Sequence, residues 1–265
     1  MADMIVNVES LNFRSAPENA PDTLKGQVFL GQRLTHVEDA GVEGWVSCRA
    51  TIEDAEDAGF VKAEFLRKPI SKPREALVAS VHREWMRFRR GTGLEHVPPF
   101  SGFVGEMWQN IGIDLDGTDR DQPWSAAAIS FMVKNAGNKY RKFKFASSHS
   151  KYIHHAIKAR EADDRSVPFW GFRLSERKPR VGDLVCKDNP DFAPSVNFDV
   201  ARELDAYRSH CDIIMKVDSE RQRVLTIGGN VSHSVGITFY DLAPGDLLAP
   251  TNHVFALLAN ITDEE

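Results

Sequence analysis

Residues 123–130 read Pro-Trp-Ser-Ala-Ala-Ala-Ile-Ser, and residues 209–214 read Ser-His-Cys-Asp-Ile-Ile. The first stretch opens a predicted helix, with Asp121 as the expected N-cap, Pro123 in the first turn and Gly137 closing the C-terminus. The second stretch begins a predicted apolar strand. The serine at the start of this helix and the histidine at the start of this strand are the residues that most strongly indicate the fold and the function.

Helices come before strands in this part of the chain. Apolar residues at helical spacing, or suitable start and stop residues, predict helices over residues 74–90, 103–111 and 148–160. Beyond Pro179 the pattern changes to short apolar runs. Strands are expected at Asp183–Lys187, Cys211–Val217, Arg223–Ile227, Val235–Tyr240 and Val254–Leu258. This order predicts an α+β domain over residues 74–265, with helices packed on an antiparallel sheet.

The N-terminal region reads as a small β domain. Its apolar runs are short and end in turn formers such as Gly31, which is typical of all-β folds. Residues 51–58 carry four acidic side chains in eight positions and are expected to form a solvated loop. Residues 68–73, Lys-Pro-Ile-Ser-Lys-Pro, read as a linker. The predicted organisation is a domain over residues 1–67, the linker, and the α+β domain.

Composition excludes several classes of protein. The 265 residues carry 33 Lys and Arg against 38 Asp and Glu, a net charge of −5, which disfavours a nucleic-acid binder. No run approaches the roughly 20 apolar residues that cross a bilayer. The N-terminus shows no secretory signal. We therefore expect synthesis in the cytoplasm, no nucleic-acid partner and no membrane insertion.

The three cysteines do not predict a nucleophile. Cys48, Cys186 and Cys211 are too few and too scattered for a disulfide framework, and no Cys-x-x-Cys pair is present to hold zinc. Cys211 follows His210 on a strand, so the two side chains leave on opposite faces. Cys186 lies in a predicted buried strand, where cysteine usually behaves as a small hydrophobe.

Ser125, His210 and Asn230 form the predicted catalytic set. The first turn of a helix offers free backbone N–H groups and a positive dipole end, so the Ser125 N–H would serve the oxyanion hole. A hairpin would place Asn230 level with His210, where its amide oxygen holds the imidazole in one tautomer. Asp212 lies on the same strand face as His210, either as a supporting residue or as a salt-bridged structural one.

Two further residues are expected in supporting or substrate-binding roles. Trp124 is an aromatic beside Ser125 that would line a substrate groove or pack in the core. His149 is expected as an active-site wall or as a satisfied helix-start residue. A zinc site that joins His149, His210 and Asp212 is the weaker alternative, because no metal-binding spacing is present. We therefore expect no metal and no cofactor.

The N-terminal region resembles a bacterial SH3 domain. The likeness is carried by Ser-Leu-Asn-Phe-Arg-Ser-Ala-Pro at 10–17, Gly-Gln at 31–32, Trp45, Gly-Phe-Val at 59–61 and Phe-Leu at 65–66. It implies a small β-barrel, which in that family binds cell-wall peptides or packs beside a catalytic domain; a plain spacer is the alternative. The acidic stretch at 51–58 departs from the family pattern.

The second domain resembles the NlpC-type and CHAP-type cell-wall peptidases, which have a papain-like fold, and most of all a related bacterial domain family of unknown function. The likeness spans about residues 75–260. It is carried by Pro-Trp-Ser-Ala-Ala at 123–127, Asn-Ala-Gly at 135–137, Ser-His-Ser-x-Tyr-Ile at 148–153, Pro-Arg-Val-Gly-Asp-Leu-Val at 179–185, Ser-His-Cys-Asp-Ile at 209–213 and Gly-Gly-Asn-Val at 228–231.

One residue departs from the pattern of these peptidases, which have a cysteine where this chain has Ser125. Serine is a weak nucleophile unless a base activates it fully. Two interpretations follow: either His210 activates Ser125, or the domain has lost hydrolysis and retains binding.

The sequence favours the active interpretation, a hydrolase of amide bonds in peptidoglycan peptide. Ser125 would be the nucleophile, His210 the general base and acid, and Asn230 the orienting residue. The alternative is a non-catalytic cell-wall-binding or structural component of a secretion or phage machine. Without a signal peptide, a wall substrate requires delivery to the periplasm or cell wall by a secretion apparatus or by phage lysis. A secretion-system or inhibitor protein is the expected partner. An intracellular peptide substrate remains open.

Overall fold

A computed structural model describes residues 2–192 and 195–264 of the chain. The chain divides into two compact units, residues 1–75 and residues 76–265, and the division falls just after the predicted linker of residues 68–73. The end of that linker is helical, because α1 begins at Lys72. In the part of the chain that the structure describes, no helix is both long and apolar enough to cross a membrane.

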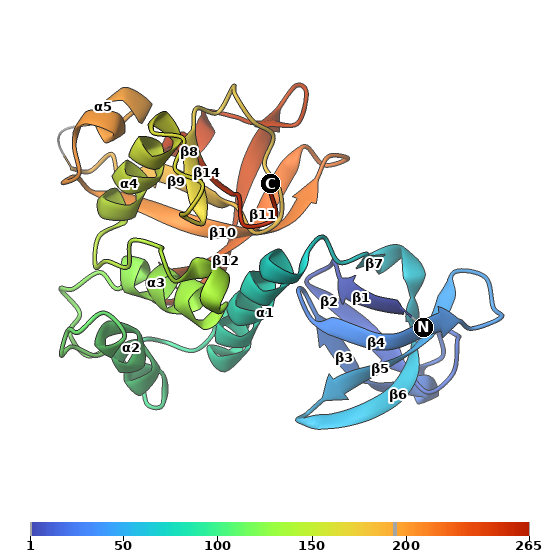
Figure 1. Ribbon diagram of the computed structural model, residues 1–265. Helices are drawn as coiled ribbons and strands as arrows, with labels where there is room; N and C mark the ends of the chain where they lie inside the picture. The colour runs from blue at the N-terminus through green and yellow to red at the C-terminus, as the bar shows by residue number, and fades with distance from the viewer. Residues whose placement is uncertain (1, 193–194, 265) are drawn as a thin grey trace. The chain divides into compact units, whose positions relative to one another are not determined.

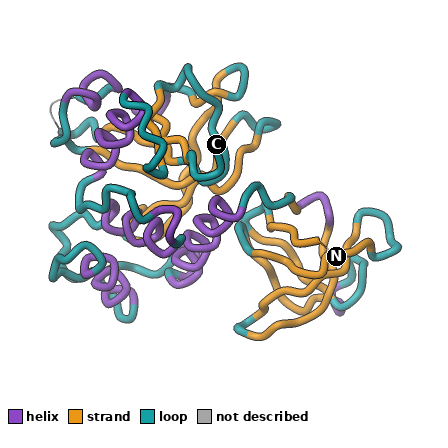
Figure 2. The backbone as a smooth tube through the Cα atoms, in the orientation of Figure 1, coloured by secondary structure: helices purple, strands orange, loops and turns teal. Residues whose placement is uncertain are grey.

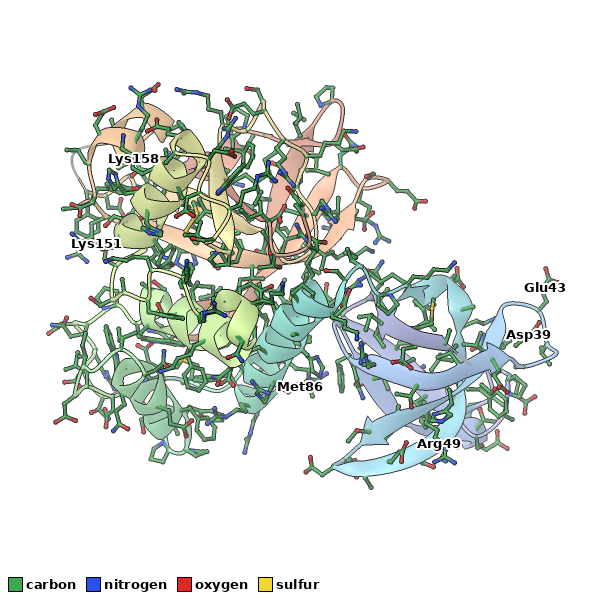
Figure 3. The ribbon with its side chains drawn as sticks, viewed as in Figure 1. Asp39, Glu43, Arg49, Met86, Lys151 and Lys158 are labelled. Atoms are coloured by element: carbon green, nitrogen blue, oxygen red, sulfur yellow. A yellow bond between two sulfur atoms is a disulfide. The ribbon has the colours of Figure 1, made fainter. Side chains whose placement is uncertain are left out.

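The first unit is a curled antiparallel sheet (Figures 1 and 2). Its strands are β1 (Ala2–Val6), β2 (Ser10–Arg14), β3 (Leu24–Phe29), β4 (Arg33–Asp39), β5 (Trp45–Ile52), β6 (Ala55–Lys62) and β7 (Leu66–Arg67), in the order β3-β2-β6-β5-β4-β1-β7. Buried apolar side chains such as Val6, Phe13 and Val61 fill the core. Asp39 and Glu43 lie at the exposed β4–β5 turn (Figure 3).

The acidic stretch at 51–58 is a hairpin, so the predicted solvated loop is wrong. Ile52 pairs with Ala55 across the turn between β5 and β6. Glu53 and Asp54 have φ values of +47° and +68°, the left-handed conformation that a two-residue hairpin turn requires. Asp57 forms an ion pair of 2.6 Å with Lys25 of β3. Their charge correctly indicated that most of these side chains are exposed, but exposed side chains occur in a loop and equally at the exposed end of a hairpin.

The second unit places helices before an antiparallel sheet, which confirms that the chain mixes helices with antiparallel strands. Its helices are α1 (Lys72–Arg87), α2 (Phe100–Gln109), α3 (Ser125–Asn135), α4 (His149–Glu161) and α5 (Phe198–Glu203). Its strands are β8 (Phe169–Phe172), β9 (Leu184–Asp188), β10 (Ser209–Asp218), β11 (Arg223–Val231), β12 (Ser234–Ala243), β13 (Leu247–Leu248) and β14 (Val254–Asn260), in the order β13-β12-β11-β10-β9-β14-β8.

Helices α3 and α4 pack on this sheet (Figure 1), α3 against β11 and α4 against β8. The apolar side of α4 is buried at Tyr152 and Ile153, while Lys151 and Lys158 lie on its outer side (Figure 3). Strand β8 was not expected from the sequence, because its four residues are too few to show a period.

Helix α3 begins later than the sequence predicts. Ser125 is its first residue and Trp124 is the cap residue, without a side-chain capping hydrogen bond. Asp121, the predicted N-cap, is exposed and lies before the helix. The start is set by tertiary contacts, since the buried Trp124 indole donates a hydrogen bond to the Glu95 carboxylate and stacks on Phe88 at 5.6 Å.

Cys186 and Cys211 form a disulfide. This corrects the expectation that Cys186 has a free thiol and acts only as a small hydrophobic residue. The two residues face each other on β9 and β10, with their Cα atoms 4.3 Å apart, and both are buried. The sequence could not show this, because it depends on β9 pairing with β10 in this register. Cys48 is a free buried thiol.

Reduction of the Cys186–Cys211 disulfide should lower the free energy of unfolding of the second unit. The bond closes a loop across a sequence separation of 25, and the loss of that constraint corresponds to about 3 to 4 kcal/mol in the chain-entropy description. The measurement is a urea titration with and without reductant. The double variant Cys186→Ala/Cys211→Ala is the control that reductant should leave unchanged. More than one reactive thiol in the denatured, unreduced protein would contradict the disulfide.

Candidate active site

Two helix N-termini bring a serine and a histidine together. Ser125 is the first residue of α3 and His149 is the first residue of α4. The Ser125 Oγ lies 2.6 Å from the His149 Nε2, a normal hydrogen-bond distance. The two side chains are 7% and 4% exposed. A serine hydroxyl bonded to an imidazole is the arrangement that activates serine as a nucleophile.

The surroundings of His149 keep its imidazole neutral. Burial lowers the pKa of His149 well below its usual value, the nearby His210 lowers it further, and Asp212 opposes these effects. The other ring nitrogen, Nδ1, is hydrogen-bonded to the Tyr152 hydroxyl one turn along α4. Burial raises the pKa of Tyr152 well above its usual value, so this hydroxyl stays protonated. An imidazole that is neutral at neutral pH can accept a proton.

A second histidine lies beside the first. The His149 and His210 rings are 5.2 Å apart between centroids. The His210 Nε2 is 2.7 Å from the Asp212 Oδ1, and the Tyr240 hydroxyl donates to the Asp212 Oδ2 at 2.6 Å. Burial raises the pKa of Asp212, but His210 and the Tyr240 hydrogen bond together bring it below its usual value. Asp212 is therefore a buried carboxylate whose charge is compensated by its neighbours.

The glycines of β11 make room for this cluster. A Cβ on Gly228 would lie 1.7 Å from the Asp212 Oδ1 and 3.4 Å from the His210 Nε2. A Cβ on Gly229 would lie 2.2 Å from the Ala128 Cβ and 3.0 Å from the Trp124 ring. The Gly-Gly pair therefore allows α3 and the His210–Asp212 pair to approach the same strand.

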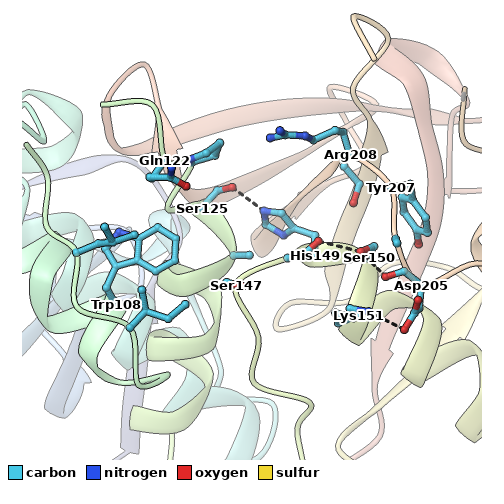
Figure 4. A pocket seen from close by; sticks show the side chains of 17 residues that line it. Trp108, Gln122, Ser125, Ser147, His149, Ser150, Lys151, Asp205, Tyr207 and Arg208 are labelled. Carbon is cyan, nitrogen blue, oxygen red and sulfur yellow. Dashed lines mark hydrogen bonds and ion pairs between the residues drawn. The ribbon is translucent and has the colours of Figure 1, made fainter. Parts of the chain in front are cut away.

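The Ser125–His149 pair lies on the wall of an open pocket of about 540 Å³ (Figure 4). Most of the lining side chains are small or polar, with Trp108, Ile113 and Leu115 adding an apolar side. Lys151 and Asp205, both on the wall, form an ion pair of 2.8 Å. The pocket can thus hold a polar substrate directly against the serine hydroxyl.

The structure brings together most of the residues predicted as a site, in a different pairing. Ser125 bonds to His149, where His210 was expected, so His149 is more than a pocket wall. His210 and Asp212 share a strand face as predicted, and they bond directly. Trp124 is 2% exposed and lies in the core, so it supports the start of α3 and lines no groove.

Asn230 does not take the orienting position expected of it. Strands β10 and β11 pair antiparallel, with Ile213 opposite Ile227, but the register becomes irregular after Gly228. Asn230 has a φ of +57°, and in the described residues its side chain has no hydrogen bond to His210. Alternation does not set side-chain direction at such an irregularity. Asp212 is the residue that holds His210.

Two tyrosines of the cluster were missed by sequence reasoning. Tyr152 follows His149 at the i,i+3 spacing that places two side chains on one helix face, so the signal was present. Tyr240 reaches Asp212 from β12, which is separated from β10 by β11. Its partner depends on the strand order, which no local pattern shows.

Within residues 2–192 and 195–264, no group of three or more His, Cys, Asp or Glu side chains has an arrangement that could hold a metal ion. In the zinc set considered above, the nitrogens of His149 are bonded to Ser125 and Tyr152. His210 is bonded to Asp212.

The fold and the site define a mixed α+β protein with a hydrogen-bonded serine–histidine pair at a pocket. This chain belongs to the family described as "Uncharacterized protein conserved in bacteria (DUF2272)", whose profile matches residues 103–256. No curated protein matched the chain. Among solved structures, NlpC2 from Trichomonas vaginalis is similar at 12% identity and a TM-score of 0.25, over 98% of this chain and 73% of that one.

Proposed function

We propose that this protein is a serine hydrolase that cleaves an amide bond of a peptide substrate, with Ser125 as its nucleophile. The observation that carries the proposal is the 2.6 Å hydrogen bond between the Ser125 Oγ and the His149 Nε2 at the wall of the pocket. Nucleophile, base and a group that orients the base are the three parts of such a site. Tyr152, bonded to the His149 Nδ1, is the third part here.

The first chemical step is attack by the Ser125 Oγ on the amide carbonyl carbon. The hydroxyl proton passes to the His149 Nε2, which then donates it to the leaving amine as the C–N bond breaks. A water molecule next attacks the acyl-serine and gives a proton to His149. As the C–O bond to the serine breaks, His149 returns a proton to the Ser125 Oγ, which releases the carboxylic acid and the free serine. Asp212 favours the transient imidazolium, since its charge raises the pKa of His149.

The oxyanion that forms during this attack would be held by the N-terminus of α3. Ser125 and Ala126 are the first two residues of that helix and both line the pocket. Their backbone N–H groups have no acceptor four residues back within the helix, and the helix dipole places partial positive charge there. Donors of this kind stabilise a developing oxyanion.

The substrate class that we propose is peptidoglycan peptide, and it rests on the resemblance of residues 123–127, 148–153 and 209–213 to cell-wall peptidases. On such a substrate the protein would act in the cell wall or the periplasm. The alternative is a binding component without turnover, which the presence of serine in place of cysteine at residue 125 favours.

The test uses the purified full chain and purified peptidoglycan whose free amines have been acetylated. We expect new amino groups to appear with the native protein and none with Ser125→Ala. The neutral ester p-nitrophenyl acetate provides a second assay that does not depend on the wall. Absence of turnover in both assays would support the binding alternative. Equal turnover by Ser125→Ala would remove the serine from the mechanism.

Hydrolysis should persist to lower pH than an ordinary histidine base allows. The base must be neutral to accept the serine proton, so activity is lost as the pH falls through its pKa. The unperturbed value is about 6.5, and burial lowers the pKa of His149. The acid limb of kcat/KM against pH should therefore lie below about 6.5, measured with p-nitrophenyl acetate. An acid limb above that value would show that another group is the base.

A further inference from the structure

Arg208 presents a cation to the pocket, and none of the residues that the structure describes accepts a hydrogen bond from it. It directly precedes β10 and lines the same pocket as Ser125 and His149. Its guanidinium carbon lies 4.9 Å from the ring centre of Phe192, and in the described residues no hydrogen bond or ion pair holds it. Figure 4 shows the side chain extending from its wall toward Ser125 and Gln122.

The other cation of the pocket wall is already neutralised. Lys151 forms its ion pair with Asp205, and these two residues with Arg208 are the Lys, Arg, Asp and Glu side chains that line the pocket. Elsewhere in the second unit, arginines such as Arg173 and Arg180 have carboxylate partners at 2.6 and 3.2 Å. The pocket beside the serine therefore retains one uncompensated positive charge.

The neighbours of Arg208 add hydroxyl groups that have no hydrogen-bond partner in the described part of the chain. Tyr207 is 9% exposed and Ser209 is partly buried, and both line the pocket. The Tyr207 hydroxyl and the Ser209 Oγ are buried atoms with no hydrogen-bond partner among the described residues. Buried polar groups normally have a partner. Three consecutive residues thus leave donors unused on one wall of the pocket.

We infer that Arg208 binds a carboxylate of the substrate next to the amide bond that Ser125 attacks, and this inference rests on the proposed function. The planar guanidinium fork matches a carboxylate and can donate two parallel hydrogen bonds to it. Such a contact fixes the orientation of the substrate as well as its affinity. Arg208 is thus a specificity residue that selects peptides with a free carboxylate near the scissile bond.

The test compares two forms of one substrate. Stem peptides from purified peptidoglycan are acetylated at their amines and divided, and one half is converted to methylamides at its carboxyl groups. For the native protein, kcat/KM should be about 10- to 100-fold higher for the acid form. The variant Arg208→Gln should lose this preference, and Arg208→Lys should retain part of it. High salt should weaken the preference, because screening reduces an exposed charge contact.

A matched control is Arg223→Gln. Arg223 also stacks on an exposed phenylalanine, at 4.3 Å from the Phe239 ring centre, but it does not line the pocket. Its removal should leave the preference for the acid form unchanged. Equal kcat/KM for both peptide forms, in a native protein that hydrolyses them, would overturn the role of Arg208 and leave the proposed hydrolysis intact.

A binding measurement tests the role of Arg208 without requiring that the protein hydrolyses its substrate. Ser125→Ala cannot turn the peptides over, so calorimetry on that variant measures affinity alone. We expect the acid form to bind about 10-fold or more tightly than the methylamide form, and the added Arg208→Gln substitution to remove the difference. If the native protein hydrolyses neither peptides nor p-nitrophenyl acetate, the proposed function fails. The carboxylate site is still tested by binding: tighter binding of the acid form supports it, and equal binding of the two forms overturns it.

Discussion

Replacing Ser125 by alanine should abolish hydrolysis and leave the protein folded. Loss of the nucleophile of a serine–histidine site costs on the order of 10⁴-fold or more in kcat. The lost hydrogen bond to the buried His149 should lower the free energy of unfolding by about 1 to 3 kcal/mol. The measurements are amine release from peptidoglycan, p-nitrophenyl acetate turnover and a urea titration.

The matched variant Ser125→Cys should retain activity, because a thiol is intrinsically more nucleophilic than a hydroxyl and the neutral His149 imidazole can take up its proton during attack. It should also become sensitive to thiol alkylation, whereas the native protein should not, since its free cysteine, Cys48, is buried in the first unit. Turnover by Ser125→Ala equal to that of the native protein would show that Ser125 is not the nucleophile. Turnover lost in both variants together with a large loss of stability would indicate a structural role for the hydroxyl.

His149→Ala should reduce kcat more than His210→Ala does. The histidine that contacts the Ser125 hydroxyl is His149, and removal of a general base costs about 10²- to 10⁴-fold. His210, held by Asp212, acts on His149 through its charge and packing, so its removal should cost less. The same ester and peptidoglycan assays measure both variants, with urea titrations to correct for any unfolded fraction.

This comparison decides between the partner that the structure shows and the one that the sequence predicts. A larger loss in His210→Ala would make His210 the base and would require the Ser125 side chain to change partner during catalysis. Asn230→Ala serves as the control, because its side chain has no hydrogen bond to His210 in the described residues. We expect its kcat to lie within a few-fold of the native value.

Local patterns predicted much of the second unit. The apolar stripe of Leu77, Val78, Val81 and Trp85 is buried along one side of α1, and α2, α3 and α4 lie where helices were expected. Periodicity reports which side of a segment is buried, and that is a local property. Periodicity missed β8, because that strand is short. The charge pattern at residues 51–58 predicted a loop, although these charged side chains lie on a hairpin.

Most of the residues predicted as a site lie close together, but the serine is bonded to a different histidine from the one expected. Ser125 was placed at a helix start, and His210 and Asp212 on one strand face, because each statement concerns neighbours in the sequence. Asn230 was placed by assuming a regular hairpin, and the irregular register after Gly228 removes that assumption. The Cys186–Cys211 bond was missed for a similar reason, since it needs the register of β9 against β10.

The sequence by itself determined that this chain has a helix-start serine, a strand-start histidine with a carboxylate two residues on, and a pair of glycines at the end of the next strand. Only the tertiary structure decided which histidine reaches the serine. The N-termini of α3 and α4 meet because both helices pack on the same sheet, and that packing joins residues 24 positions apart. Side-chain period and capping act over one or two turns, whereas the contact between Ser125 and His149 depends on how whole elements pack together.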